Sequence, residues 1–344
     1  MTQNIVISGE TLTGKTLVAL GLAKYLRDLG KNVGYLKPVG GVNDEDAAVL
    51  KQVLGIEAGI ESICPIVRTK ARYDEFLRIG HDTLLTKIKE AYEIVSVNSD
   101  FMIIEGTKAP WNLLHVGLSA PQIAKEFNAQ VICLVNFPDV TAIDDILLQR
   151  DLFKQQGIEN ISIVLNMVPP MHRNLVNEKI GPFVQEMGLR FLGAVYHRRE
   201  LFSPTIREIL QTLSGQMLNG DAKKDLLIDQ FMVGSMAPEN ALKWFRRAKD
   251  KAVITSGDRS DICLAAMETD TNLLILTGGM GPDIQTIAKA KETGVPIMMT
   301  AHDTYTASHL VDSLVGTVSP DDLEKVAVIE RIMLESLDLS HLKM

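Results

Sequence analysis

The sequence has few cysteines and no spacing that would pair them or make them bind a metal. Its 3 cysteines are Cys64, Cys133 and Cys263, and none belongs to a CxxC motif or a zinc-ligand pattern. No basic-then-apolar segment opens the chain, and no apolar run reaches the roughly 18 residues that suggest a membrane helix. We therefore expect a cytoplasmic protein without a membrane partner.

Basic residues are also too few to make the chain positive. The 35 lysines and arginines stand against 43 aspartates and glutamates, which gives a formal net charge of −8. Nucleic-acid-binding proteins usually carry a basic surface, so we expect no nucleic-acid partner. The 7 histidines are isolated, and neither a Ser-His-Asp nor a Cys-His arrangement can be argued from them.

Short β-branched runs alternate with helical patterns in the first half of the chain. Strands are predicted at 4–8, 32–36, 101–104, 130–135 and 161–165, with helices at 17–29 and 143–153. Runs of this length are typical of buried strands in a parallel sheet. The alternation predicts an α/β doubly wound fold.

A polar, glycine-containing stretch around Leu210–Asp225 indicates a domain boundary. A chain of 344 residues is long enough for two domains at roughly 100–200 residues each. We predict a first domain at 1–212 and a smaller α/β domain at 225–325. Further strands are predicted at 252–255, 272–276 and 296–300, and helices at 239–248, 258–268, 283–293 and 304–314.

The first predicted strand runs into a glycine-rich turn, Gly9-Glu10-Thr11-Leu12-Thr13-Gly14-Lys15-Thr16. This turn matches the pattern G-x-x-x-x-G-K-[ST] in full, with a strand before it and a helix after it. In such a P-loop, backbone N–H groups point at phosphates, the lysine reaches the outer phosphates and the threonine hydroxyl binds Mg²⁺. The turn therefore predicts a site for ATP and magnesium.

Three further features fit the same site. Lys37 follows the second strand, where it could hold a phosphate or a substrate carboxylate or could simply be solvated. Asp44, Glu45 and Asp46 open a helix, where acids are stabilised by the helix dipole or could reach Mg²⁺. Glu105 ends an apolar strand, the usual place of the acid that completes magnesium binding in P-loop proteins.

Asn166 ends a later strand, Ile161–Asn166. Its amide could donate to and accept from an adenine edge. Alternatively it is a turn-forming asparagine, because Pro169-Pro170 follows.

The second domain has two turns that each follow a strand and open a helix. In the first turn, Asp258 is expected to cap the helix and Arg259 is then free to pair with a carboxylate or phosphate. In the second turn, Thr277-Gly278-Gly279 begins a glycine-rich segment that could approach a ligand closely. Both turns could form one ligand crevice, or could be structural and serve a dimer contact.

Gly9–Thr16, Lys37-Pro38-Val39, Asp46-Ala47-Ala48 and Ile104-Glu105-Gly106 together resemble dethiobiotin synthetase, an ATP-dependent carboxylase and ligase with a P-loop. The resemblance covers roughly residues 1–212. It implies a P-loop NTPase-type parallel sheet, with Thr16, Asp46 and Glu105 as magnesium ligands. It also implies phosphate or substrate contacts from Lys15 and Lys37, and Asn166 at the adenine. The segment Gly106–Asn112 departs from the glycine-rich substrate turn of that family.

Asp258-Arg259 and Thr277-Gly278-Gly279 resemble the two signatures of the DRTGG domain. A dethiobiotin-synthetase-like domain followed by a DRTGG domain resembles the N-terminal regulatory part of long bacterial phosphate acetyltransferases. In those enzymes a catalytic domain comes next, at about the position where Met344 ends this sequence. The resemblance therefore implies regulation without acetyl transfer, a small-molecule effector at the DRTGG domain and a homodimer.

Two functions remain open from the sequence, ahead of a purely structural scaffold. One is a nucleotide-binding regulator or sensor, with ATP in the first domain and an effector or dimer contact in the second. The other is an ATP-dependent ligase or carboxylase, since Lys15, Lys37 and the acids supply the positioning and charge neutralisation that phosphoryl transfer needs.

Overall fold

The computed structural model describes residues 2–42, 44–68, 78–198, 203–312, 314 and 323–340. Contacts divide the chain into a first unit, Met1–Arg198 with Val318–Met344, and a second unit, Arg199–Thr317. The second unit is thus inserted into the sequence of the first. Compared with the predicted ranges 1–212 and 225–325, the first unit ends earlier and includes the C-terminal segment.

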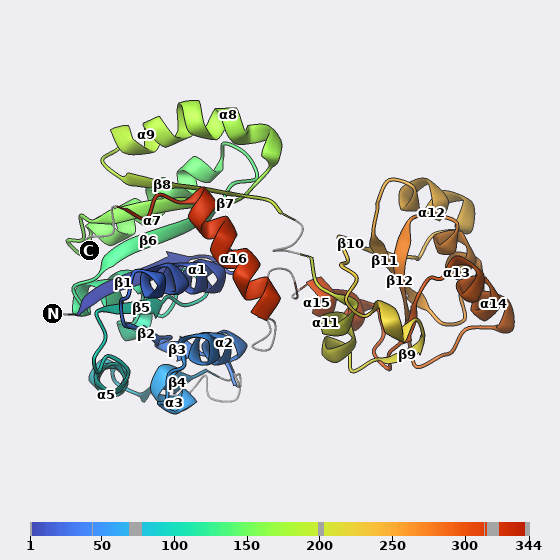
Figure 1. Ribbon diagram of the computed structural model, residues 1–344, viewed down its shortest axis with the longest axis horizontal. Helices are drawn as coiled ribbons and strands as arrows, with labels where there is room; N and C mark the ends of the chain where they lie inside the picture. Colours follow the sequence, from blue (N-terminus) through green and yellow to red (C-terminus); the bar gives the residue numbers. More distant parts are fainter. Residues whose placement is uncertain are drawn as a thin grey trace. The chain divides into compact units, whose positions relative to one another are not determined.

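The first unit is built on a six-stranded parallel sheet in the order β2-β5-β1-β6-β7-β8 (Figure 1). Its strands are β1 (Gln3–Gly9), β2 (Val33–Leu36), β5 (Phe101–Glu105), β6 (Gln130–Asn136), β7 (Ile161–Val168) and β8 (Arg190–Tyr196). A separate two-stranded piece pairs β3 (Val39–Gly40) with β4 (Ile66–Val67). The central strands are almost wholly buried, as expected for a parallel sheet covered on both faces.

Helices connect these strands, and one returns from the end of the chain. They are α1 (Lys15–Asp28), α2 (Glu45–Leu54), α3 (Ile60–Ile63), α5 (His81–Val95), α6 (Ala120–Glu126), α7 (Ala142–Lys154), α8 (Arg173–Leu175), α9 (Gly181–Glu186) and α16 (Leu323–Ser336). Single turns of other helix types lie at Leu114–Val116, Pro170–His172 and Val176–Ile180.

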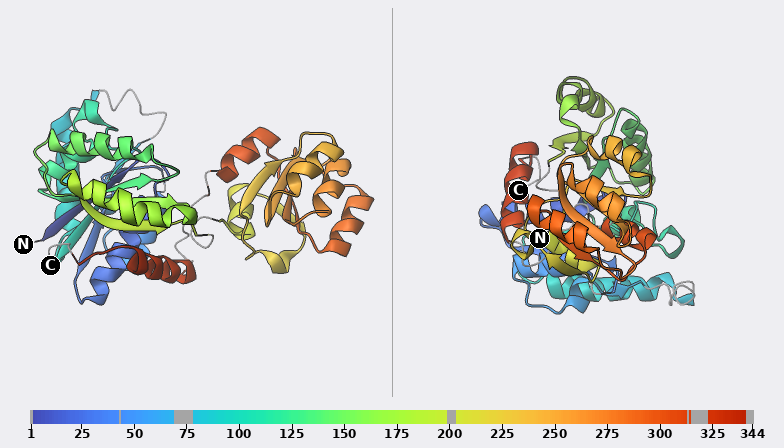
Figure 2. Two further views of the ribbon diagram at one scale, coloured as in Figure 1. Left: turned by 90° about the horizontal axis from the view of Figure 1, so that it is seen from above. Right: turned by 90° about the vertical axis from the view of Figure 1, so that its right-hand side faces the viewer.

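Helix α16 completes the cover of the sheet. Along the sheet, the step from β1 to β2 and the step from β6 to β7 go in opposite directions. Because crossover connections between parallel strands are right-handed, α1 and α7 therefore lie on opposite faces of the sheet. On the face of the sheet that α1 covers, the last strands, β7 and β8, then need to be covered by another element. Helix α16 packs beside α1 and against β8 (Figures 1 and 2), and Leu337 after it bridges Gly193 of β8.

The second unit holds a five-stranded sheet in the order β10-β11-β12-β13-β9. Four strands are parallel and β9 is antiparallel to β13. They are β9 (Gln216–Asn219), β10 (Gln230–Val233), β11 (Lys251–Ser256), β12 (Thr271–Thr277) and β13 (Ile297–Met299). The helices are α11 (Ile206–Thr212), α12 (Pro238–Phe245), α13 (Ser260–Met267), α14 (Ile284–Thr293) and α15 (Thr304–Asp312), with a 3-10 turn at Asp221–Lys223.

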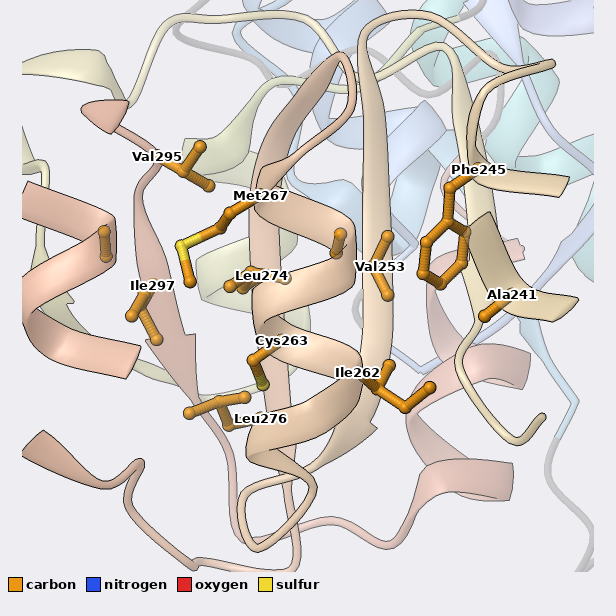
Figure 3. Packing of buried hydrophobic residues seen from close by; sticks show 12 residues of the cluster. Ala241, Phe245, Val253, Ile262, Cys263, Met267, Leu274, Leu276, Val295 and Ile297 are labelled. Carbon is orange, nitrogen blue, oxygen red and sulfur yellow. The ribbon is translucent and has the colours of Figure 1, made fainter. Parts of the chain in front are cut away.

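Two apolar layers hold this unit together, one on each face of its sheet. In the layer of Figure 3, Ile262 and Cys263 of α13 pack with Val253 and Leu274 of the central strands. The opposite layer joins Ile209 of α11 and other apolar side chains of α11 and α15 to the same strands. The second unit therefore has its own core, as expected of a domain.

The predicted fold class, a P-loop-type parallel α/β sheet followed by a smaller α/β domain, is confirmed. All the predicted strands and helices are present with small shifts at their ends. Other elements were not predicted: strands β3, β4, β8, β9 and β10, and helices α3, α5, α6, α8, α9, α11 and α16. Among the described residues, no helix combines the length and apolar character needed to cross a membrane.

Candidate functional site

The turn from β1 into α1 has a backbone that two glycines make possible. Gly14 precedes the helix with φ 81°, in the left-handed region that favours glycine. A Cβ on Gly14 would lie 2.5 Å from the Asn166 amide nitrogen, and one on Gly9 would lie 2.8 Å from the Leu134 carbonyl. The turn is therefore packed tightly against β6 and β7. The first N–H groups of α1 have no partner within the helix and lie at the carboxyl edge of the sheet.

Lys15 is buried and folds back over this turn. Its Nζ donates to the carbonyl oxygens of Gly9 at 3.1 Å and Glu10 at 2.6 Å. Burial lowers the pKa of Lys15 below its usual range, and the charge of Glu105 only partly offsets this effect. The ammonium is thus held by two neutral carbonyls, which a phosphate oxygen can replace as a stronger, charge-assisted partner.

The threonine hydroxyls of the P-loop donate hydrogen bonds either within the turn or to a neighbouring segment. Thr13 is buried and donates to the Glu10 carbonyl at 2.8 Å. Thr11 is exposed and donates to the Lys108 carbonyl at 3.2 Å, which ties the turn to the segment after β5. Thr16, one residue into α1, donates to Glu105 Oε1 at 3.3 Å.

Glu105 at the end of β5 is the centre of the site. Its carboxylate is 2% exposed, and its second oxygen, Oε2, accepts a hydrogen bond from the Tyr35 hydroxyl at 2.8 Å. The Nζ of Lys37 lies 3.5 Å from Oε1. Burial raises the pKa of Glu105, and the charge of Lys37 opposes this effect. The predicted meeting of Thr16 and Glu105 is therefore present in the structure.

Lys37 is an integral part of the site and not a solvated loop residue. It is 8% exposed, and its Nζ lies 2.8 Å from Asp44 Oδ1 and 2.6 Å from Asp46 Oδ2. Burial alone would lower the pKa of Lys37, but the charges of Glu105, Asp46 and Asp44 outweigh it and raise the pKa. The ammonium thus stands among three carboxylates.

Asp44 is the N-cap of α2. From the sequence, only the acidic cluster as a whole could be assigned to the start of this helix. The Asp44 side chain accepts from the backbone N–H of Ala47 at 3.1 Å and of Gly41 at 3.0 Å. Burial would raise the pKa of Asp44, but Lys37 and these N–H groups lower it. Asp46 is more exposed, and it pairs with Lys37.

The donor set fits Mg²⁺ chemistry. The Thr16 hydroxyl and the carboxylates of Glu105 and Asp46 are oxygen donors, which Mg²⁺ prefers. Within the described parts of the chain, no three side chains of the His, Cys, Asp or Glu type converge closely enough to hold a metal by themselves. In proteins, Mg²⁺ is usually held by one or two carboxylates, with phosphate oxygens and water completing the shell.

Asn166 lies under the P-loop. Its amide donates to the Thr13 carbonyl at 2.8 Å, and its neighbour across the sheet, Asn136, donates to the Leu12 carbonyl at 3.4 Å. Among the described residues, the Oδ1 atoms of both asparagines are buried and have no hydrogen-bond partner. Sequence reasoning missed Asn136 and Tyr35, although both stand in strands that end at this edge.

In the second unit, the two signature turns meet at the carboxyl edge of the sheet. A Cβ on Gly257 would run into the Met280 carbonyl, so the turn after β11 packs directly on the turn after β12. Gly278 and Gly279 have φ 78° and 64°, and their N–H groups donate to the carbonyls of His302 and Thr300 at 2.8 and 2.9 Å.

The charged residues of these turns differ from the prediction in one respect. Arg259, and not Asp258, holds the N-cap position of α13, and no side chain caps the helix, so the predicted cap was wrong. Arg259 donates to both oxygens of Asp261 at 2.9 and 3.0 Å and to the Met236 carbonyl. Asp258 is exposed. Thr277 is buried and shares a hydrogen bond with Thr304 at 2.8 Å.

Comparisons with known proteins agree with this architecture. The phosphate acetyltransferase of Nitratidesulfovibrio vulgaris is 27% identical over 368 residues, which cover 99% of this chain and 51% of that protein. The ATP-dependent dethiobiotin synthetase BioD of Methanocaldococcus jannaschii is 28% identical over 214 residues, 60% of this chain and 100% of that protein. The chain thus spans about half the length of the phosphate acetyltransferase.

One of the solved structures to which this chain is similar also contains a DRTGG domain. It shows the CBS and DRTGG domains of the regulatory region of Clostridium perfringens pyrophosphatase, complexed with the activator diadenosine tetraphosphate. It is 30% identical, covers 38% of this chain and 60% of that chain, and has a TM-score of 0.29. The DRTGG domain model matches residues 208–314, and the AAA domain model matches residues 3–205. The chain therefore belongs to the AAA domain family, with a DRTGG domain after it, and the predicted resemblance is confirmed.

Proposed function

We propose that the first unit binds ATP with Mg²⁺ and that the chain is a nucleotide-dependent regulator. One observation carries the proposal: Lys15, Thr16 and Glu105 meet where α1 begins, at the carboxyl edge of a parallel sheet. Helix N-termini at such edges bind phosphate groups. The DRTGG domain and the similarity to phosphate acetyltransferases support a regulatory role.

Each residue then has a definite part. The backbone of Gly9, Thr11, Thr13 and Gly14 surrounds the phosphates, and Lys15 binds the outer ones. Thr16, Glu105 and Asp46 hold the metal, whose chemistry is to neutralise phosphate charge. Lys37 would contact a phosphate or a substrate carboxylate, and Asn166 would support the phosphate-binding turn through its hydrogen bond to the Thr13 carbonyl.

For the second unit we propose a small-molecule effector at the edge formed by Asp258, Arg259 and Thr277-Gly278-Gly279. Support comes from the packing of these turns on one another at the ends of parallel strands. The exposed apolar side chains of Ile284 and Tyr305 at the same edge favour a contact between two copies, and hence a homodimer.

Calorimetric titration of the full chain with ATP and Mg²⁺ tests the proposal. The wild type and Lys87→Ala, which alters an exposed lysine of α5, should bind ATP equally. Lys15→Ala should lose at least about tenfold in affinity, since a charge-assisted hydrogen bond is worth roughly 1.5–3 kcal/mol. Equal binding by Lys15→Ala would contradict the proposed site.

The same variant separates the two units. If diadenosine tetraphosphate is an effector of the second unit, Lys15→Ala should bind it as the wild type does. Loss of both ligands in Lys15→Ala would place them in one site, against the proposal. The proposal assigns no acetyl transfer to either unit, and an assay with acetyl-CoA and phosphate would check this directly.

A second function, an ATP-dependent ligase or carboxylase, is favoured by the placement of Lys37. Its ammonium reaches Glu105 beside the P-loop, and the whole length of a dethiobiotin synthetase aligns with this chain. The assay is ADP release with small carboxylates, and with amines plus bicarbonate. Turnover that Lys37→Met abolishes without loss of ATP binding would favour the ligase, whereas binding with no turnover would favour the regulator.

A further inference from the structure

Tyr35 is a fully buried phenol whose hydroxyl has a charged partner. Its side chain has 0% exposure, and the hydroxyl donates to Glu105 Oε2 at 2.8 Å. Burying a phenol hydroxyl costs free energy unless it finds a partner, and here the partner is a carboxylate. The P-loop motif does not include this residue, and packing alone would be served equally well by phenylalanine.

The strand register explains why Tyr35 reaches Glu105. Tyr35 of β2 stands opposite Ile103 of β5, and Leu36 stands opposite Ile104. Side chains alternate along a strand, so Tyr35 and Lys37 point to the same side as Ile103 and Glu105. Both Tyr35 and Lys37 can therefore contact the same carboxylate, one at each oxygen.

The two oxygens of Glu105 consequently have different roles. Oε2 is occupied by the Tyr35 hydroxyl, whereas Oε1 lies 3.3 Å from the Thr16 hydroxyl and 3.5 Å from Lys37 Nζ. A carboxylate held at one oxygen cannot rotate freely about its terminal bond. Its other oxygen is then presented in a fixed direction, toward the first turn of α1.

We infer that Tyr35 is a positioning residue for the metal of the nucleotide complex: it holds Glu105 so that Oε1 faces Mg²⁺ beside Thr16. The inference rests on the proposed ATP–Mg²⁺ site. Residues that hydrogen-bond a metal ligand orient it, and removing them typically costs 10- to 100-fold in metal affinity. Tyr35 acts through Glu105 and touches neither nucleotide nor metal.

The test is a Mg²⁺ titration of ATP binding by Tyr35→Phe in the full chain. This variant keeps the ring and removes only the hydroxyl. The Mg²⁺ concentration at half-maximal enhancement should rise about 10- to 100-fold, while ATP affinity in EDTA stays at the wild-type value. If Tyr35 had a merely structural role, Tyr35→Phe would weaken both Mg²⁺ binding and ATP binding in EDTA, or would change neither.

Tyr92→Phe is the matched control. It also removes a phenol hydroxyl that donates to a side chain, Asn4 Oδ1 at 2.7 Å, but on α5. Its Mg²⁺ titration should coincide with that of the wild type. If Tyr35→Phe coincides too, the inference is overturned and the proposed site stands; if the wild type binds no ATP with Mg²⁺, the proposed function fails and the inference with it.

A second variant covers the case in which Tyr35→Phe does not fold. Incorporation of 4-methylphenylalanine at position 35 replaces the hydroxyl with a methyl group, which fills the same space but cannot donate a hydrogen bond. The Mg²⁺ requirement should then rise about 10- to 100-fold, as expected for Tyr35→Phe. A Mg²⁺ requirement equal to that of the wild type would overturn the inference.

Discussion

Asp44 has two kinds of partner, and only one of them needs its negative charge. Its carboxylate accepts hydrogen bonds from the N–H groups of Gly41 and Ala47, which an asparagine oxygen could also do. It also pairs with the Lys37 ammonium, and the two side chains are 11% and 10% exposed. The ion pair is thus largely shielded from water, so screening by solvent is limited.

Asp44→Asn should therefore destabilise the first unit by about 1–3 kcal/mol at pH 7, since it removes a hydrogen bond to a charged group. The pKa of Asp44 is lowered in the folded state. Its stabilisation is accordingly present at pH values above the usual aspartate pKa of about 3.9, and is lost as the pH falls through the lower folded pKa. The difference between wild type and variant should shrink below about pH 4.

Urea unfolding at several pH values measures this difference. The chain has 2 tryptophans, Trp111 in the first unit and Trp244 in the second, so a Trp244→Phe background lets Trp111 report on the first unit alone. Asp144→Asn, an exposed acid in the first turn of α7, is the control and should change stability by less than about 1 kcal/mol. A difference for Asp44→Asn that persists unchanged at pH 3 would contradict the ion-pair explanation.

The residues of the site that follow one another in the sequence are easier to predict than those that distant strands contribute. Gly9–Thr16 can be predicted because one turn carries the whole phosphate-binding geometry, and Glu105 because an acid at the end of an apolar strand has few other uses. Tyr35 and Asn136 escape prediction because they act through partners far away in the sequence. Nothing in one strand's pattern reveals which carboxylate or carbonyl the next strand will offer.

At the scale of elements, the contact between α1 and α16 is unusually close at one glycine. Gly21 lies in α1, and a Cβ there would lie 2.8 Å from Met333 Cβ and closer still to Met333 Cγ. Ile329, Ile332 and Met333 of α16 are all essentially buried. The absence of a side chain at Gly21 thus allows α16 to cover the sheet beside the P-loop helix.

Gly21→Ala should destabilise the first unit even though alanine favours helix by up to about 1 kcal/mol over glycine. Overpacking against Met333 costs typically 1–3 kcal/mol and should exceed that gain. Urea unfolding in the Trp244→Phe background gives the sign of the change in the free energy of unfolding. A stabilisation of about 1 kcal/mol would mean that α16 does not pack on Gly21.

The double variant Gly21→Ala with Met333→Ala is the control for this contact. Met333→Ala alone should cost about 2–5 kcal/mol, because it leaves a cavity. When Gly21→Ala is already present, the same truncation should cost less, since the new methyl group fills part of the space. Additive effects would contradict direct contact between the two positions.

Four of the elements that were not predicted, β8, β9, β10 and α16, have physical reasons for escaping prediction. Strands β9 and β10 are half-exposed and carry polar residues, so they lack the apolar runs of buried strands. Strand β8 is interrupted by Gly193, where φ is 138° and the backbone of Ser336 approaches closely. Helix α16 has a helical pattern, but only the tertiary structure reveals that it belongs to the first unit.

At the scale of the whole molecule, one unit is inserted into the other. The chain leaves the first unit after β8, forms the second unit and returns to place α16 on α1, the helix that the P-loop opens. Strand β8, after which the chain leaves the first unit, and helix α16, with which it returns, therefore both belong to the P-loop unit. The AAA domain and DRTGG domain ranges, 3–205 and 208–314, follow the same division.

A crystal structure of the full chain with a non-hydrolysable ATP analogue and Mg²⁺ tests the central claim most directly. We predict that Lys15 Nζ leaves the carbonyls of Gly9 and Glu10 for the outer phosphates, and that Mg²⁺ lies beside the Thr16 hydroxyl and Glu105 Oε1. An analogue bound elsewhere, or a P-loop in which Lys15 keeps its contacts to Gly9 and Glu10, would contradict the account.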